Sequence, residues 1–202
     1  VEIVDTPGLF SRHSAHNSIT RDVLPDAHAV IFLLEPMKLG EAHFTEEIRH
    51  YVVEAKNSNL DRRSRHIFFI INKLDECHRI YDKLVAELEA SLEGILPQPR
   101  VLGVSSYYAL ASRRYQRHEL TLKDLQRDNH LFVPDPDSPD DFLSGRLLEE
   151  RHVPLLAEQS RIADVESALS SYLENRYLYI VENVIDRTHL LCARVLEELD
   201  VE

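Results

Sequence analysis

Four short apolar runs constrain the fold of this chain more than any other feature of its sequence. They lie at 1–4, 27–34, 66–71 and 100–105, and most are continuously apolar rather than alternating. Such runs indicate strands in a sheet that is covered on both faces. Two stretches with helical spacing separate the last three runs; their apolar positions are Phe44, Ile48, Tyr51, Val52 and Ala55, then Ile80, Leu84, Leu88, Leu92 and Ile95. Strands alternating with helices predict an α/β fold of three layers with a mostly parallel sheet.

The second half of the chain follows a different pattern. Residues 107–131 look helical but irregular, and residues 133–141 form a proline-rich acidic stretch that predicts a surface loop without regular structure. From about residue 161, an apolar stripe without proline or glycine predicts one long helix, or two in close succession. We therefore divide the chain into a core at 1–110, an insertion at 111–160 and C-terminal helices at 161–202.

Charge and composition narrow the class of protein. The formal net charge of −12 disfavours binding to nucleic acid, because an acidic surface repels the phosphate backbone. The two cysteines, Cys77 and Cys192, are far apart and fit a reducing cytoplasmic setting better than a disulfide scaffold. No apolar run approaches the ~18 residues that a membrane-spanning helix needs.

The motif Asp5-Thr6-Pro7-Gly8 directly follows the first apolar run. A carboxylate at the end of a strand can hold Mg²⁺ through a water molecule, and a glycine lets a backbone N–H approach a terminal phosphate closely. We take Asp5, Thr6 and Gly8 as candidate catalytic residues and Asp5 as the candidate Mg²⁺ ligand. A plain turn between two elements explains this motif equally well when it is taken alone.

A second motif, Asn72-Lys73-Leu74-Asp75, follows the run at 66–71. Guanine presents two adjacent donors, N1–H and the 2-amino group, and the carboxylate of Asp75 could accept both. The aliphatic stem of Lys73 could lie across the base, and Asn72 could tie this loop to its neighbours.

Ser105 and Ser106 follow the next run, where their backbone amides could meet the guanine O6, although ordinary strand termination is an equal alternative. All these motifs fall at the ends of successive strands, the edge at which open α/β sheets bind ligands.

Together the three motifs resemble the later guanine-nucleotide motifs of P-loop GTPases. Within that class, the segments at 5–9, 16–20, 24–27 and 67–75 look like bacterial dynamin-like proteins, and the resemblance covers about residues 1–110. It implies a P-loop NTPase-type fold, binding of GTP or GDP with Mg²⁺, and GTP hydrolysis in membrane remodelling. It further implies self-association through GTPase domains, a peripheral position at a membrane that other regions contact, and C-terminal helices that lead to a stalk or trunk.

The sequence departs from the family pattern in two places. It contains no G-x-x-x-x-G-K-[ST] motif, and Leu9 stands where some small GTPases carry a glutamine that orients water. We expect the phosphate-binding loop and the switch threonine to lie upstream of Val1, so that this chain alone neither binds GTP tightly nor hydrolyses it. We expect the intact enzyme to turn over slowly, and faster at higher protein concentration.

Two other functions remain open from the sequence. The chain could be a catalytically inactive GTPase-like module for interaction or dimerisation, which the sequence upstream would reveal. It could also belong to a non-dynamin GTPase of the translation-factor class. The long segment after Ser106 and the acidic balance argue against that second alternative.

Overall fold

The computed structural model of the chain describes residues 3–5, 27, 29–39, 41–57, 67–96 and 98–199. These residues belong to two units, Val1–Val165 and Glu166–Glu202. The first unit is a mixed α/β structure that contains every candidate site residue. The second consists of the greater part of one helix, and each unit is described by itself.

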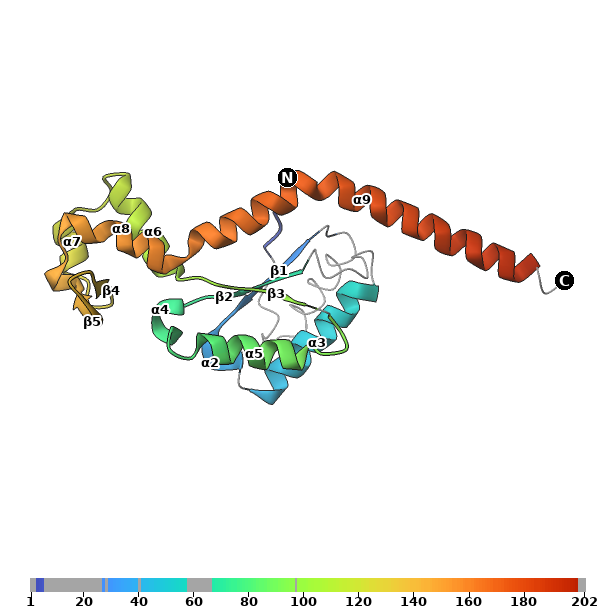
Figure 1. Ribbon diagram of the computed structural model, residues 1–202, viewed down its shortest axis with the longest axis horizontal. Helices are drawn as coiled ribbons and strands as arrows, with labels where there is room; N and C mark the ends of the chain where they lie inside the picture. The colour runs from blue at the N-terminus through green and yellow to red at the C-terminus, as the bar shows by residue number, and fades with distance from the viewer. Residues whose placement is uncertain are drawn as a thin grey trace. The chain divides into compact units, whose positions relative to one another are not determined.

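A parallel three-stranded sheet forms the centre of the first unit (Figure 1). Strands β1 (Val30–Leu34), β2 (Ile67–Ile71) and β3 (Arg100–Gly103) lie in the order β1-β2-β3. The three later apolar runs of the sequence are thus strands, and the expected α/β class with parallel pairing is confirmed for them. Parallel pairing brings the three carboxyl ends to one edge of the sheet, which is where the candidate residues of the second and third motifs follow.

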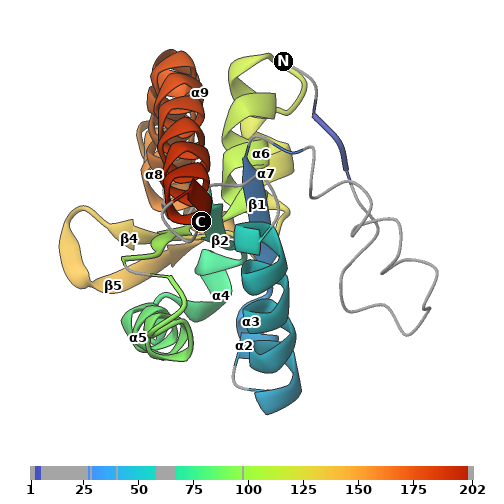
Figure 2. The same cartoon turned by 90° about the vertical axis from the view of Figure 1, so that its right-hand side faces the viewer.

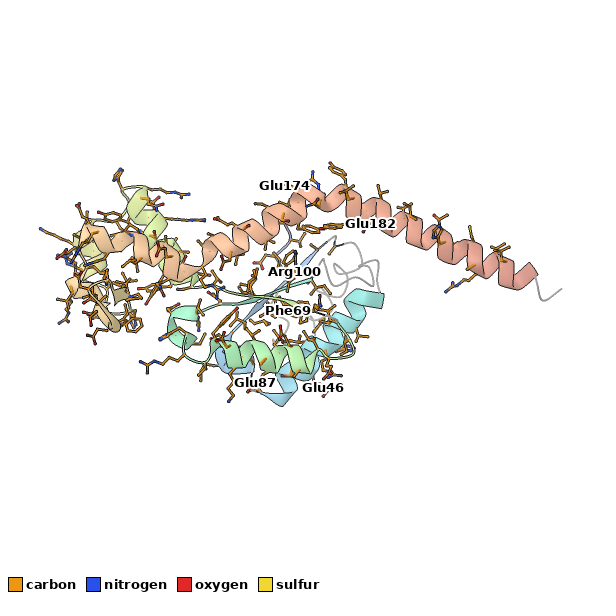
Figure 3. The ribbon with its side chains drawn as sticks, viewed as in Figure 1. Glu46, Phe69, Glu87, Arg100, Glu174 and Glu182 are labelled. Atoms are coloured by element: carbon orange, nitrogen blue, oxygen red, sulfur yellow. The ribbon has the colours of Figure 1, made fainter. Side chains whose placement is uncertain are left out.

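One face of the sheet packs against helices α3 (Ala42–Asn57) and α5 (Tyr81–Ser91), which lie on the same side of it (Figure 1). Both helices were predicted from their apolar spacing. At the centre of this core the rings of Phe32 and Phe69 stack with their centroids 5.2 Å apart. Figure 3 shows Phe69 between the sheet and these helices. Two short helices, α2 (Pro36–Leu39) and α4 (Leu74–Cys77), follow β1 and β2.

The opposite face of the sheet is covered unevenly. All five side chains of β2 are buried, as its continuous apolar pattern predicts. In β1, by contrast, Ile31 and Leu33 are 48% and 63% exposed, so the expectation of cover on both faces is wrong for this strand. The predicted strand at 1–4 is not formed where it is described, because Ile3 and Val4 pair with no described strand and are exposed.

The segment after β3 forms a second hydrophobic cluster within the first unit. It contains helices, a hairpin and two short 3₁₀ turns: α6 (Ser106–Gln116), α7 (Leu122–Gln126), β4 (Phe132–Asp135), β5 (Ser138–Ser144), η3 (Gly145–Leu147), η4 (Glu150–His152) and α8 (Val153–Ser160). The helical character expected for 107–131 is therefore confirmed in α6 and α7. Side chains that these elements share, rather than the sheet, fill this cluster.

The hairpin β4–β5 corrects the prediction of an irregular loop at 133–141 (Figure 2). The proline-rich sequence is compatible with strands here because each strand of a two-stranded sheet is an edge, and an edge strand tolerates a missing N–H. Pro134 pairs with Phe142 in this way, at a point where the register shifts. The turn is closed by Asp135, whose side-chain oxygen accepts the N–H of Asp137 at 2.9 Å, a local bond typical of aspartate in turns.

Helix α9 (Ile162–Leu199) runs without interruption for 38 residues. Of the two possibilities left open by the sequence, one long helix is correct. No helix in the described part of the chain combines the length and apolar character needed to cross a bilayer.

Candidate functional site

The loops after β2 and β3 are joined to each other and to β1 by backbone hydrogen bonds. The N–H of Asn72 donates to the carbonyl of Leu34 at 3.0 Å, and the N–H of Leu74 donates to that of Val104 at 3.1 Å. These bonds continue the parallel ladder past the strand ends. The second and third motifs of the sequence therefore lie side by side at the carboxyl edge of the sheet.

Asn72 connects the two loops through its side chain. Its Oδ1 accepts the backbone N–H of Ser106 at 3.1 Å. Ser106 is the first residue of α6, and the first N–H groups of a helix have no partner inside the helix. The tie that we expected from Asn72 is present, and it links the loop after β2 to the start of α6.

Ser105 is fully buried and caps the N-terminus of α6. Its Oγ accepts the N–H of Tyr108 at 3.1 Å, and its own N–H donates to the carbonyl of Ser160 at 2.9 Å. The amides of both Ser105 and Ser106 thus have partners inside the protein, and neither is free in this structure to meet a base carbonyl. The next amide, that of Tyr107, donates to no acceptor among the described residues.

Lys73 adopts a left-handed backbone conformation, with φ 60° and ψ 38°. This conformation costs a residue other than glycine about 1–3 kcal/mol and is often found at functional sites. The Nζ of Lys73 lies 2.5 Å from Oε1 of Glu35, the residue that follows β1. The hydrogen bond from Lys73 lowers the pKa of the Glu35 carboxyl, and Glu35 in turn raises the pKa of Lys73. Both side chains are about two-fifths exposed, so the pair contributes little to the stability of the fold.

Glu35 is a residue that the sequence analysis missed. Its only signal in the sequence is its place directly after an apolar run, at the same edge as the other motifs.

Asp75, in the first turn of α4, carries an unusual carboxylate oxygen. Its Oδ1 is buried and has no hydrogen-bond partner among the described residues. A buried carboxylate oxygen without a donor is unfavourable by about 1–3 kcal/mol or more. A donor that reached this atom would remove that cost, and the Asp75 side chain as a whole is only partly buried.

A cleft of about 660 Å³ opens beside Asp75. One side consists of α4 with the start of α5, and the other consists of Tyr108 of α6, the β4–β5 hairpin and the end of α8. Gly103 at the end of β3 allows Tyr81 to line it, because a Cβ at that glycine would lie 2.6 Å from Cε2 of Tyr81. Lys73, Ser105 and Ser106 do not line this cleft, whereas Asp75 and the neighbouring Leu74 of the second motif do.

The first motif is described only in part. Asp5 is exposed, whereas Thr6 and Gly8 lie outside the described residues. Within the described ranges, no group of three or more His, Cys, Asp or Glu side chains could hold a metal ion. Magnesium bound to a nucleotide takes most of its ligands from phosphates and water, so a single carboxylate such as Asp5 fits one water-mediated contact and no more.

No protein-family model, curated protein or solved structure significantly matches this chain. The chemical capability of the candidate site therefore depends on the arrangement of residues at the carboxyl edge of the sheet. There Asp75 has a buried carboxylate oxygen without a hydrogen-bond partner among the described residues, Lys73 is paired with Glu35, and Asn72 ties the surrounding loops together.

Proposed function

We propose that this chain carries the base-recognition half of a guanine-nucleotide site in a dynamin-like GTPase with a P-loop NTPase-type sheet. The observation that carries the proposal is the buried, unpartnered Oδ1 of Asp75 at the carboxyl edge of a parallel sheet. Guanine supplies two adjacent N–H donors, which one carboxylate can accept together. Adenine presents no such pair of donors, so this carboxylate favours guanine.

The neighbouring contacts support this role for Asp75. Asn72 fixes the loop after β2 to the start of α6, which holds the reading carboxylate against the last strand. Preorganised groups of this kind lower the free energy that binding would otherwise lose to ordering.

Phosphate binding is assigned to none of the residues of this sequence, because it contains no G-x-x-x-x-G-K-[ST] motif. Asp5 would then make the water-mediated contact to Mg²⁺, with Thr6 and Gly8 beside the terminal phosphate. GTP hydrolysis, self-association through GTPase domains and action at a membrane belong to that whole protein. The reading frame upstream of Val1 tests this part directly, since an in-frame G-x-x-x-x-G-K-[ST] is expected there and its absence favours an inactive interaction module.

Base recognition can be tested on the chain as it stands. We expect GMP to bind weakly but selectively over AMP in titrations followed by NMR chemical shifts. Asp75→Asn should lower the affinity for GMP and shift the preference toward XMP by about tenfold or more, because an amide can donate to the 2-oxo group of xanthine. Glu76→Gln, an exposed carboxylate change at the next position of α4, is the matched control. Unchanged preference for GMP in Asp75→Asn would falsify the reading role of Asp75.

A further inference from the structure

The β4–β5 hairpin presents an aromatic face to the cleft beside Asp75. Phe132 pairs with Ser144, and Pro134 pairs with Phe142, which places the two phenylalanines diagonally on one face of the hairpin. Both line the cleft and are nearly half exposed, at 46% and 47%. On the other face, Val133 is completely buried in the second hydrophobic cluster. The hairpin therefore packs through one face and leaves the aromatic face toward the cleft.

The contacts of these rings hold the aromatic face in place. The backbone N–H of Phe132 donates to the hydroxyl of Tyr108 at 3.0 Å, and Tyr108 is itself buried and lines the cleft. The ring of Phe142 lies 5.6 Å from that of His78, across the cleft in the turn after α4. The hairpin is thus attached to both sides of the cleft that contains Asp75.

Size and charge indicate what kind of ligand the cleft suits. A volume of about 660 Å³ falls in the ordinary range for small-molecule sites. Its lining contains three carboxylates, two arginines and one histidine. One of the arginines, Arg161, is already paired with Asp164 at 3.0 Å and lies over the Tyr81 ring at 5.5 Å. A lining with this balance of charge does not favour a phosphate group, whereas a flat, uncharged ring with N–H donors satisfies both Asp75 and the aromatic face.

We infer that the cleft receives the base of the nucleotide and that Phe132 and Phe142 form its outer wall. This inference rests on the proposed function and adds to it the residues that determine affinity for the base. The base lies between the hairpin and α4, with its donors directed at Asp75. Since stacking on an aromatic ring tolerates any base, the phenylalanines supply affinity and Asp75 supplies selectivity.

The test is a set of titrations of the whole chain with GMP and AMP, followed by NMR chemical shifts. Phe142→Ala and Phe132→Ala should each weaken GMP binding at least fivefold, which is the lower end expected for loss of one base–aromatic contact. Phe142→Leu keeps apolar bulk in the hairpin but lacks the ring, and should also weaken binding. Leu147→Ala removes an exposed apolar side chain from the same insertion, away from the cleft, and should bind GMP as the unmodified chain does. Circular dichroism establishes that each variant is folded.

The outcomes of these titrations distinguish a failure of the aromatic wall, formed by Phe132 and Phe142, from a failure of the proposed function. If Asp75→Asn weakens GMP binding but the phenylalanine variants match Leu147→Ala, the wall is refuted and base reading by Asp75 stands. If AMP and GMP bind equally and both depend on Phe142, the wall stands and guanine selectivity is refuted. If GMP does not bind to the unmodified chain, both are refuted.

Discussion

The tie between Asn72 and Ser106 can be measured as a coupling free energy. Asn72→Ala removes the acceptor, and Ser106→Pro removes the backbone donor without disturbing the helix, because proline is favoured at the first position of a helix. Ser105 has an extended backbone, with φ −101° and ψ 96°, which a following proline tolerates. The double variant completes a cycle in which effects unrelated to the bond cancel.

The expected coupling free energy can be worked out from the character of this hydrogen bond. It joins two uncharged groups at 3.1 Å and is exposed to water. A bond of this kind contributes about 0.5–1.5 kcal/mol net, and exposure places it in the lower half of that range, since water replaces either lost partner. We therefore expect Asn72→Ala and Ser106→Pro each to destabilise the chain modestly. Their combination should be less harmful than the sum of the two by about 0.5–1 kcal/mol.

Equilibrium unfolding in urea provides the assay, with comparison of midpoints at a common slope. Ser106→Ala keeps the backbone donor and should lie within about 0.5 kcal/mol of the unmodified chain. A coupling energy indistinguishable from zero, below about 0.3 kcal/mol, would show that Asn72 does not hold the two loops together. The preorganisation invoked for base reading would then rest on the backbone bond from Leu74 to Val104 without help from Asn72.

Two further predictions concern the insertion. Gly145→Ala should destabilise the chain by about 1–3 kcal/mol, because a Cβ there would lie 2.2 Å from the carbonyl oxygen of Asp128, a backbone atom that cannot move freely; an unchanged melting temperature would contradict this. The pKa of Asp124 is lowered by hydrogen bonds from Thr121, so its contribution to stability is present above the ordinary carboxyl pKa and is lost as pH falls through the lowered value. Asp124→Asn should therefore be less stable than the unmodified chain at about pH 6, and the difference should shrink toward about pH 2; a pH-independent difference in urea midpoints would count against the capping role.

The local pattern of apolar residues predicted the central strands and helices correctly. The strands at 30–34, 67–71 and 100–103 are short apolar runs, and α3 and α5 have a regular apolar stripe, so burial alone specifies them. The link from Asn72 to the loop after β3 was predictable because parallel strands bring their carboxyl ends together. These features depend on residues close in sequence or on a single pairing rule.

Features that depend on tertiary contacts were not predictable in the same way. The prolines of the hairpin indicate a loop by local rules, and only its isolation as a two-stranded sheet makes them acceptable. Lys73 has a left-handed backbone conformation. Its side chain contacts Glu35, which lies 38 residues away in the sequence. The cleft is made by side chains from several elements, so no single stretch of sequence reveals it.

The absence of a side chain at Gly103 has a consequence for how this protein can evolve. The Tyr81 ring occupies the space in which a Cβ at position 103 would stand, with two ring carbons closer than 3.0 Å to that point. A larger residue at 103 is therefore tolerated only after the tyrosine has been replaced by a smaller one, and the order of the two substitutions matters. Because Tyr81 also lines the cleft, a substitution at the buried last residue of β3 changes the shape of the cleft. Positions 81 and 103 therefore constrain each other's replacement. Proteins that share this fold can in this way come to differ in what the cleft accepts.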